Sequence, residues 1–334
     1  MTILAPGAIT PVGSAYNTTP AYSGTFIPTI WSAKLNAKFY AASVFASICN
    51  KNWEGDIANL GDKVVINNIP SILIQDYVVG GNLNYQTPTP NTIEMQVDRA
   101  KSFAFQVSDV LDYQAKPELM SMFTDDAGQQ MRVVMDSTCL YRTFTGAHAS
   151  NQGATAGVKS GLFNLGIPGT PAAQTASTIL PLILSMASVL DEQNVPDSGR
   201  WLIIDPLTRT LLLQSNIASA YLTGDATSPV RNGLVGRIDR FDIYVSNNLP
   251  FAAANATVWT SGDGSEASLT GITTNVARRR TLIAGQTTAI AFASQMAKTE
   301  TLRNPTDFGD LVRGLNIFGH KVVKPEALVL AVVS

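Results

Sequence analysis

Residues 117–144 carry an uninterrupted helical repeat, and a helix of this length limits the folds that are open to the chain. Side chains suited to burial recur at the i, i+3, i+4 and i+7 spacing of one helical face: Leu119, Met122, Phe123, Ala127, Met131, Val134, Thr138 and Tyr141. The charged residues fall largely off this face: Asp125, Asp126, Arg132, Asp136 and Arg142. Pro117 suits the first position of a helix, and Gly146 suits its end. At 1.5 Å per residue the predicted helix is about 40 Å long, enough to act as a strut across a domain.

The residues before this helix, 61–108, change to a period of two, which is typical of β-strands. Hydrophobic residues alternate with polar ones at Val64, Ile66, Ile72, Ile74, Ile93, Met95, Val97, Phe103, Phe105 and Val107. Turn-forming residues occupy the middle, at Gly80-Gly81-Asn82 and in the Thr-Pro repeat of residues 87–90. The pattern predicts one long β-hairpin over residues 61–108. Because a two-stranded ribbon is marginal alone in water, we expect another surface to cover it.

The N-terminal part shows no pattern that would form a core of its own. Residues 1–25 are rich in Pro, Gly, Ser, Thr and Ala and predict an extended arm. Residues 26–48 add aromatic anchors, among them Phe26 and Trp31, and a short helix near residues 44–48. We expect these anchors to fix the arm to a surface, which could belong to a neighbouring copy.

The residues after the long helix predict a compact α/β region. Residues 146–173 are poor in charge and rich in small residues, which indicates a loop and a domain boundary. A helical stripe over residues 179–190 precedes a buried strand at 201–204, and Asp205-Pro206 supplies an N-cap and a first-position proline for a helix to about Ser215. Further predicted elements are strands at residues 241–245, 258–259 and 283–292, a turn at 262–264 and a last strand within 314–333.

The composition favours a protein that is covered by other molecules. Charged residues make up only 14% of the chain, where roughly 25% is usual. Hydrophobic residues make up 45%, so the chain can form sizeable cores and still leave much uncharged surface. The net charge of −2 and the pI of about 5.7 argue against a dedicated nucleic-acid-binding protein. Cys49 and Cys139 lie far apart and are interpreted as small buried hydrophobic residues.

The sequence contains no familiar catalytic or metal-binding motif. It lacks a phosphate-binding glycine loop that ends in Lys-Ser/Thr, a Gly-x-Ser-x-Gly elbow and a His-Glu-x-x-His motif. His148 and His320 are its only histidines, and His148 is interpreted as a solvated loop residue that nothing orients. Asp125 and Asp126 point in different directions on a helix, so we interpret them as a solvated face. The sequence therefore predicts no catalytic residue, no cofactor and no metal site.

Arg278, Arg279 and Arg280 form the one dense cluster of charge in the sequence. Guanidinium groups bind phosphates and carboxylates, so the cluster could contact nucleic acid, a neighbouring copy or only water. Because the whole chain is slightly acidic, we favour pairing with a neighbour or plain solvation over nucleic acid.

The order of these parts resembles that of the major capsid proteins of tailed bacteriophages, which have the Hong Kong 97-like fold. The resemblance covers nearly the whole chain and includes particular strings: FIPTIWSAKLNAKFY (26–40), NLGDKVVINNIP (59–70), WLIIDPLTRTLL (201–212), VGRIDRFDIYVSNNLP (235–250) and GLNIFGHKVVKPEALVLAVV (314–333). These strings look like the pattern of capsid proteins of short-tailed phages and their relatives. The resemblance implies an α+β fold in five parts: an N-terminal arm (1–60), an extended β-hairpin loop (61–108), a peripheral domain with the spine helix (109–145), an axial domain (146–286) and a return to the peripheral domain (287–334).

The function implied by this resemblance is structural rather than enzymatic. Many copies are expected to form pentamers and hexamers that close into an icosahedral shell around double-stranded DNA, without sequence-specific binding and without a membrane, in the host bacterial cytoplasm. The implied partners are other copies, a portal protein, a separate scaffolding protein and, as a further candidate, a decoration protein. The residues expected at contacts between copies are Phe26, Trp31, Gly80, Gly81, Asn82, Tyr85, Arg278, Arg279 and Arg280. Some members of this fold join a loop lysine to an asparagine of a neighbour, but residues 75–98 contain no lysine.

Two other functions remain as alternatives. An encapsulin-like compartment shell has the same fold, and a cargo gene beside this one, in place of terminase and portal genes, would identify it. A cytoplasmic enzyme with an unrecognised site is the third interpretation. Its small oligomers would sediment differently from particles or capsomers.

Overall fold

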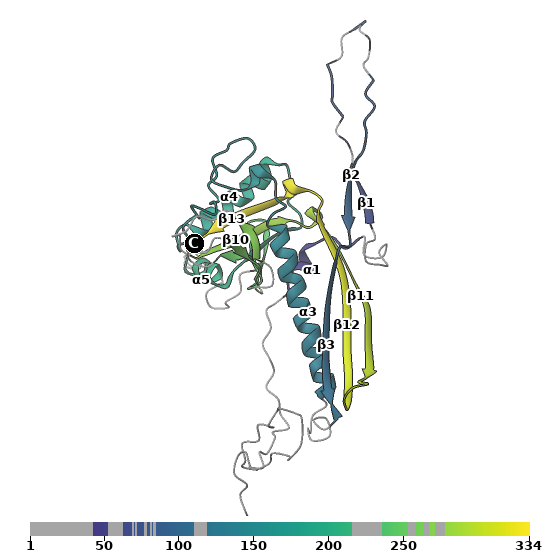
Figure 1. Ribbon diagram of the computed structural model, residues 1–334. Helices are drawn as coiled ribbons and strands as arrows, with labels where there is room; N and C mark the ends of the chain where they lie inside the picture. Colours follow the sequence, from purple (N-terminus) through teal and green to yellow (C-terminus); the bar gives the residue numbers. More distant parts are fainter. Residues whose placement is uncertain are drawn as a thin grey trace, which may run out of the picture.

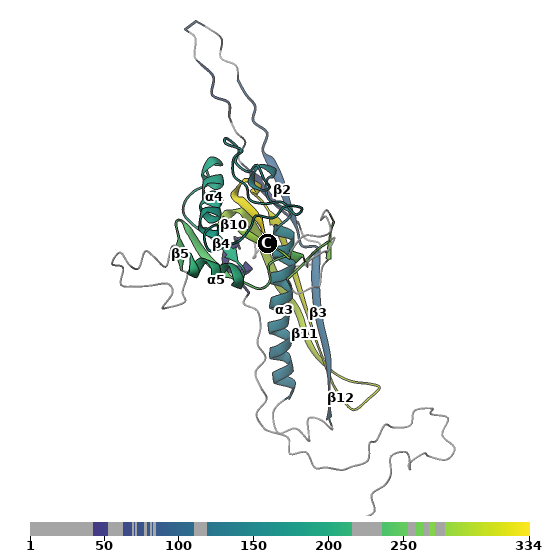
Figure 2. The ribbon, with the colours of Figure 1, turned by 90° about the vertical axis from the view of Figure 1, so that its left-hand side faces the viewer.

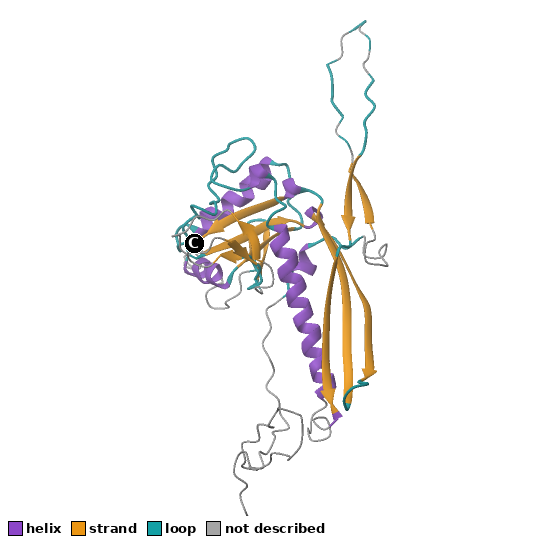
Figure 3. Ribbon diagram, in the orientation of Figure 1, coloured by secondary structure: helices purple, strands orange, loops and turns teal. Residues whose placement is uncertain are grey.

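The computed structural model describes residues 43–52, 63–68, 70, 72–76, 79–80, 82, 85–109, 119–215, 236–252, 258–262, 267–270 and 278–334. Within these ranges an elongated helix–sheet unit lies beside a rounder α/β unit, and a β-ribbon projects from the region where they meet (Figures 1 and 2). Both units mix helices and strands, as Figure 3 shows, so the predicted α+β class is confirmed.

The helix–sheet unit consists of α3 (Leu119–Thr143) along a three-stranded antiparallel sheet (Figure 1). The sheet order is β11 (Ile290–Arg303), β12 (Gly309–Val322), β3 (Arg99–Ser108). The predicted long helix is confirmed, and Pro117 lies outside the described residues. The Phe103 ring covers Gly314, where a Cβ atom would lie only 2.3 Å from the ring, so the sheet needs glycine there.

The predicted buried face of α3 is buried only in its C-terminal half. Met131 and Tyr141 are 7% and 4% exposed, whereas Met122 and Phe123 are 38% and 44% exposed. All residues from 136 to 141 are buried, because this end of the helix is inserted into the body of the protein. Asp136 is therefore buried as well, and the interpretation that places it with the charged, solvated residues of the helix is wrong.

The ribbon is shorter than the sequence predicts. β1 (Lys63–Asn68) pairs antiparallel with β2 (Asn91–Gln96), which confirms a hairpin over these residues. Residues 99–108, however, form β3 and pair with β12, from Arg99 opposite Phe318 to Ser108 opposite Gly309. The prediction of one hairpin over residues 61–108 is wrong for this last segment, because a period of two indicates a strand but not its partner.

The α/β unit is built on an eight-stranded sheet. Seven strands follow the order β5 (Arg237–Ile238), β6 (Phe241–Val245), β4 (Arg200–Ile204), β10 (Arg279–Gln286), β7 (Phe251–Ala252), β8 (Val258–Thr260) and β9 (Ala267–Thr270). β13 (Leu328–Val333) pairs with β10, and helices α4 (Ile179–Glu192) and α5 (Pro206–Gln214) complete the unit. The predicted cap is confirmed, because the Asp205 carboxylate accepts a hydrogen bond from the Thr208 backbone N–H at the start of α5.

After the passage from α3 into the α/β unit, the chain crosses between the two units twice more within residues 278–334. β10 leads through the short 3-10 helix Thr287–Ala289 into β11, and β12 leads through Pro325–Ala327 into β13. The predicted single strand over residues 283–292 is therefore wrong, since its two halves lie in different sheets. Within residues 287–334, β11 and β12 lie in the helix–sheet unit, whereas β13 pairs with β10 in the sheet of the α/β unit.

Candidate assembly surfaces

The outer part of the ribbon, which consists of the described residues 70, 72–76, 79–80, 82 and 85–90, projects beyond the body of the protein (Figure 1). Its described apolar side chains are strongly exposed: Ile74 by 88%, Val79 by 87% and Tyr85 by 87%. Gln86 joins the two sides of the ribbon, since its side-chain amide accepts from the Leu73 backbone N–H at 3.1 Å and donates to the Leu73 carbonyl at 2.7 Å. Large apolar side chains held out in this way are typical of a surface that another protein covers.

The base of the ribbon, in contrast, is anchored within the chain. Met95 is fully buried and Val97 is 1% exposed, in a small core that includes Ala291 and Ala293 of β11. A Cβ atom at Gly319 of β12 would lie 2.7 Å from the Gln96 carbonyl oxygen, so this close approach of two strands needs glycine. The body holds the base rigidly and leaves the described apolar residues of the outer part exposed.

Only some of the contact residues predicted from the sequence lie within the described part of the chain. Gly80 adopts a positive φ of 83° with open space around it, which fits a turn at the ribbon tip. Asn82 and Tyr85 are exposed. Phe26, Trp31 and Gly81 lie outside the described residues. For all of these residues, contact with another copy stays a prediction.

The three consecutive arginines do not form one exposed cluster. Arg278 is exposed and lies over the Phe251 ring, 5.2 Å from its centre. Arg279 is fully buried, and burial lowers its pKa from the usual range. Arg280 pairs with the Asp205 carboxylate at 3.3 Å. The alternation of β10 places the side chains of Arg279 and Arg280 on opposite faces, and Arg278 precedes the strand. Contact with another copy stays a prediction for all three arginines, although Arg279 is buried within the subunit.

A second exposed site, which the sequence reasoning missed, lies at the opposite end of the helix–sheet unit. Arg303 at the end of β11 binds the carboxylates of Asp109 and Asp310, and its hydrogen bond lowers the pKa of Asp109. Phe308, in the turn between β11 and β12, is 75% exposed. The turn sequence between two alternating segments is the signal that could have revealed this second hairpin.

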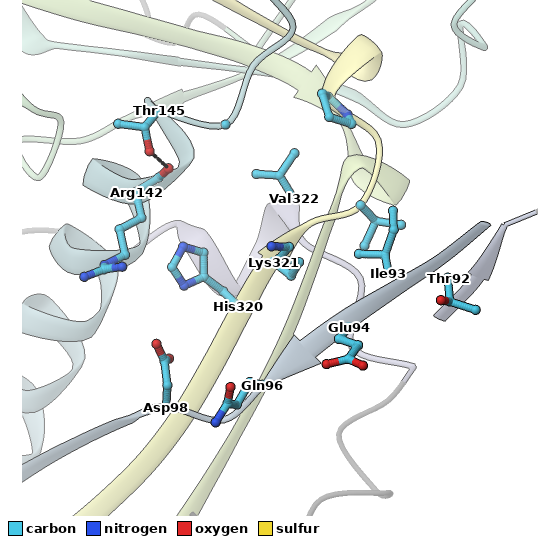
Figure 4. A pocket seen from close by; sticks show the side chains of 13 residues that line it. Thr92, Ile93, Glu94, Gln96, Asp98, Arg142, Thr145, His320, Lys321 and Val322 are labelled. Carbon is cyan, nitrogen blue, oxygen red and sulfur yellow. Dashed lines mark hydrogen bonds between the residues drawn. The ribbon is translucent and has the colours of Figure 1, made fainter. Parts of the chain in front are cut away.

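A groove of about 860 Å³ opens where the ribbon base, the end of α3 and the end of β12 meet (Figure 4). Glu94 and neighbouring residues enter it from β2, while Arg142, His320 and Lys321 enter it from α3 and β12 (Figure 4). Burial, together with the positive charges of Arg99 and Lys321, lowers the pKa of His320 to about 4. His320 is therefore neutral near pH 7.

Of the residues considered for catalysis, His148 and Asp126 make hydrogen bonds to residues close to them in the sequence. His148 is a half-buried loop residue, and its Nδ1 accepts from the Ser150 backbone N–H at 3.3 Å, so the interpretation that nothing orients it is wrong. Asp125 is exposed, and Asp126 accepts a hydrogen bond from Gln130 one turn further along the helix. None of these contacts resembles a nucleophile with its base.

Metal-binding clusters, membrane-spanning helices and disulfides are all absent from the residues that the structure describes. Among the residues that the structure describes, no group of three or more His, Cys, Asp and Glu side chains is arranged to hold a metal ion. No helix in the described ranges is both long and apolar enough to cross a membrane. Cys139 is buried and Cys49 is half-buried, and neither forms a disulfide.

The helix–sheet unit, the α/β unit and the projecting ribbon together define the Hong Kong 97-like class of shell proteins. The chain belongs to the phage capsid protein family, whose sequence model matches residues 91–331. It is a phage capsid shell protein, and the virion capsid is its location, which confirms the resemblance to phage major capsid proteins.

Solved structures support the fold. A chain from Mycobacterium phage Che8 has a TM-score of 0.70 and 23% identity, over 92% of this chain and 97% of that chain. The capsid of the cyanophage P-SCSP1u has a TM-score of 0.67 and 16% identity, over 98% and 99%. The mature capsid of bacteriophage PhiM1 has a TM-score of 0.63 and 15% identity, over 98% and 99%. No curated protein matches the chain.

Proposed function

We propose that many copies of this chain form pentamers and hexamers that close into an icosahedral shell around the double-stranded DNA of a tailed phage. The observation that carries this proposal is the exposed apolar surface of the ribbon, with Ile74, Val79 and Tyr85 all more than four-fifths exposed. An apolar strip on a narrow ribbon gains stability only when a neighbouring subunit supplies a second layer. The chain acts by binding its own copies, without a catalytic step.

The parts of the chain divide this work. The ribbon and residues 1–60 make contacts between subunits, the helix–sheet unit forms the peripheral domain, and the α/β unit forms the axial domain. A portal protein, a scaffolding protein and a decoration protein are the proposed partners. DNA is enclosed without sequence-specific contacts, which agrees with the net charge of −2.

Sedimentation and negative-stain microscopy of the purified chain test the proposal. We expect closed particles or ring-shaped capsomers, and we expect DNA in intact virions to resist nuclease until the shell is opened. A chain that sediments only as a monomer or small oligomer, at concentrations and salt conditions that favour association, would contradict the proposal.

We also predict that no covalent bond through the ribbon tip holds the shell together. The reaction needs a lysine amine, and residues 75–98 contain none. Lys63 lies at the base, paired with Glu94 at 3.1 Å, and at about 3.3 Å per residue it is up to ~55 Å along the strand from Gly80. Purified particles boiled in detergent should therefore run as one band near 35.6 kDa on a gel.

The control for this experiment introduces the missing amine. Asn82→Lys places a lysine at the exposed tip, and the same gel then shows whether a tip lysine alone is enough for cross-linking. A ladder of covalent multimers from particles of the unmodified chain would refute the prediction.

A further inference from the structure

Asp136 is a charged residue inside the body of the protein. It lies in the buried half of α3 and is 2% exposed, and the five residues that follow it are also buried. Burial is the largest effect on this carboxyl group and raises its pKa, against the opposite effect of its hydrogen bonds. Because a buried carboxylate is expensive, an apolar side chain would be the simpler solution for stability alone.

The carboxylate joins three separate parts of the chain. Its Oδ1 atom accepts from the backbone N–H groups of Val44 at 2.8 Å and Phe45 at 2.6 Å, and from the Ser43 hydroxyl at 3.2 Å. Its Oδ2 atom accepts from the Asn248 side-chain amide at 2.7 Å. Asp136 therefore binds residues 43–45 and the loop between β6 and β7 to α3.

The bonds to residues 43–45 replace a missing helix cap. α1 (Phe45–Ile48) follows the N-cap residue Val44, whose side chain makes no capping hydrogen bond. The first N–H groups of a helix need acceptors, and Asp136 supplies them from a distance of about 90 residues in the sequence. The same contact therefore fixes both the position and the direction of this short segment.

The segment is also fixed at its other end. The Asn50 N–H donates to the Ile290 carbonyl at 2.9 Å, and the Phe292 N–H donates to the Asn50 carbonyl at 3.0 Å. The buried Phe45 ring packs edge-on against Phe292, with 5.4 Å between ring centres, and Ile48 is fully buried. Residues 43–50 thus form a clip between α3 and β11, and the chain enters the described body of the protein at Ser43.

We propose that Asp136 is a positioning residue for assembly, which fixes the point and the direction at which residues 1–42 leave the subunit. This inference rests on the proposed shell function, since a segment that contacts neighbours must leave every subunit in the same direction. Through Asn248 the same carboxylate also binds the α/β unit, so Asp136 fixes the clip and the loop between β6 and β7 relative to each other. Apolar contacts hold the fold without Asp136, but they leave the clip in more than one orientation.

Trypsin cleavage of the unassembled subunit tests the clip directly. Lys51 is the only trypsin site between Lys38 and Lys63, and it follows Asn50, which is bonded to β11. Asp136→Leu removes the two acceptor oxygens and puts an apolar side chain of similar size in their place. We expect cleavage after Lys51 to become about tenfold faster or more, with near-native circular dichroism, because proteolysis follows the population of the open clip.

Two further variants separate positioning from general stability. Leu140→Ala removes buried volume one turn away, so it should lower the melting temperature without speeding cleavage after Lys51, which is already exposed. Asp136→Asn keeps an acceptor for Val44 and Phe45, and cleavage should stay within about threefold of the unmodified chain. If Asp136→Leu does not fold, Asn248→Ala and Ser43→Ala, each of which removes one bond, should show smaller increases in the same cleavage.

Particle microscopy is the second readout. We expect Asp136→Leu to give particles of mixed diameter or open sheets, and Leu140→Ala to give particles of the unmodified diameter. Unchanged cleavage after Lys51, or uniform particles from Asp136→Leu, would overturn the inference. Cleavage is measured on unassembled subunits, so it tests the clip even if the unmodified chain forms no particles. A failure of the unmodified chain to form particles would contradict only the shell function.

Discussion

Deletion of residues 79–90 is expected to abolish shell assembly while leaving the subunit folded. The deleted part includes Val79 and Tyr85, which are both 87% exposed and contribute nothing to the described core. The ribbon base keeps its own small core around Met95 and Val97, and residues 69–78 remain to join β1 to β2. Circular dichroism and melting temperature should stay near those of the unmodified chain. The yield of closed particles should fall about tenfold or more, because the proposed contact between subunits loses exposed apolar side chains of the ribbon tip.

Substitutions in the full-length ribbon separate the effect of its apolar side chains from the effect of its length. Replacing Ile74, Val79 and Tyr85 by serine keeps the ribbon but removes its apolar surface, and should reduce assembly as the deletion does. Thr87→Ala and Thr89→Ala change exposed polar residues of the same tip and should have little effect. An unfolded deletion variant, or normal particle yield from the serine variant, would show that the ribbon has another role.

The sequence was sufficient to predict the elements that are determined by residues close to one another in the chain. The length of α3, the helix α4 and the start of α5 at Asp205-Pro206 follow from periodicity and capping, which involve residues within a few positions of one another. Asn194, just after α4, adopts a positive φ of 57°, which is typical of a residue that ends a helix.

The errors lie where distant residues decide the structure. β3 has the alternation of a hairpin strand, but its partner is β12, about 200 residues later in the chain. The predicted strand over residues 283–292 divides because Gln286 bends the chain by accepting from the Thr288 backbone N–H at 2.9 Å. Asp136 has no local signal except its isolation in an uncharged stretch, since its donors come from two other parts of the chain. The alternation of β10 also separates Arg279 from Arg280, which are adjacent in the sequence.

Substitution of the buried Arg200 is expected to have the largest effect on the stability of the subunit. This guanidinium group has a fully buried side chain and binds the carboxylates of Asp191 at 2.7 Å and Asp197 at 3.2 Å. It also donates to the backbone carbonyls of Val195 at 2.6 Å and Pro196 at 3.0 Å, which hold the loop between α4 and β4. Arg200→Met keeps most of the packing but leaves these acceptors without their donor. We expect it to lower the free energy of unfolding by about 3 kcal/mol or more.

Arg240 provides a matched control, because it binds the same two carboxylates from the surface. Its side chain is 42% exposed and lies 3.0 Å from Asp191 and 2.7 Å from Asp197. Water replaces much of an exposed ion pair, so Arg240→Met should cost about 1 kcal/mol or less. Thermal melting of unassembled subunits should show a decrease of roughly 5 °C or more for Arg200→Met and a much smaller one for Arg240→Met. Equal decreases would mean that the two carboxylates, and not the buried loop carbonyls, determine the contribution of Arg200.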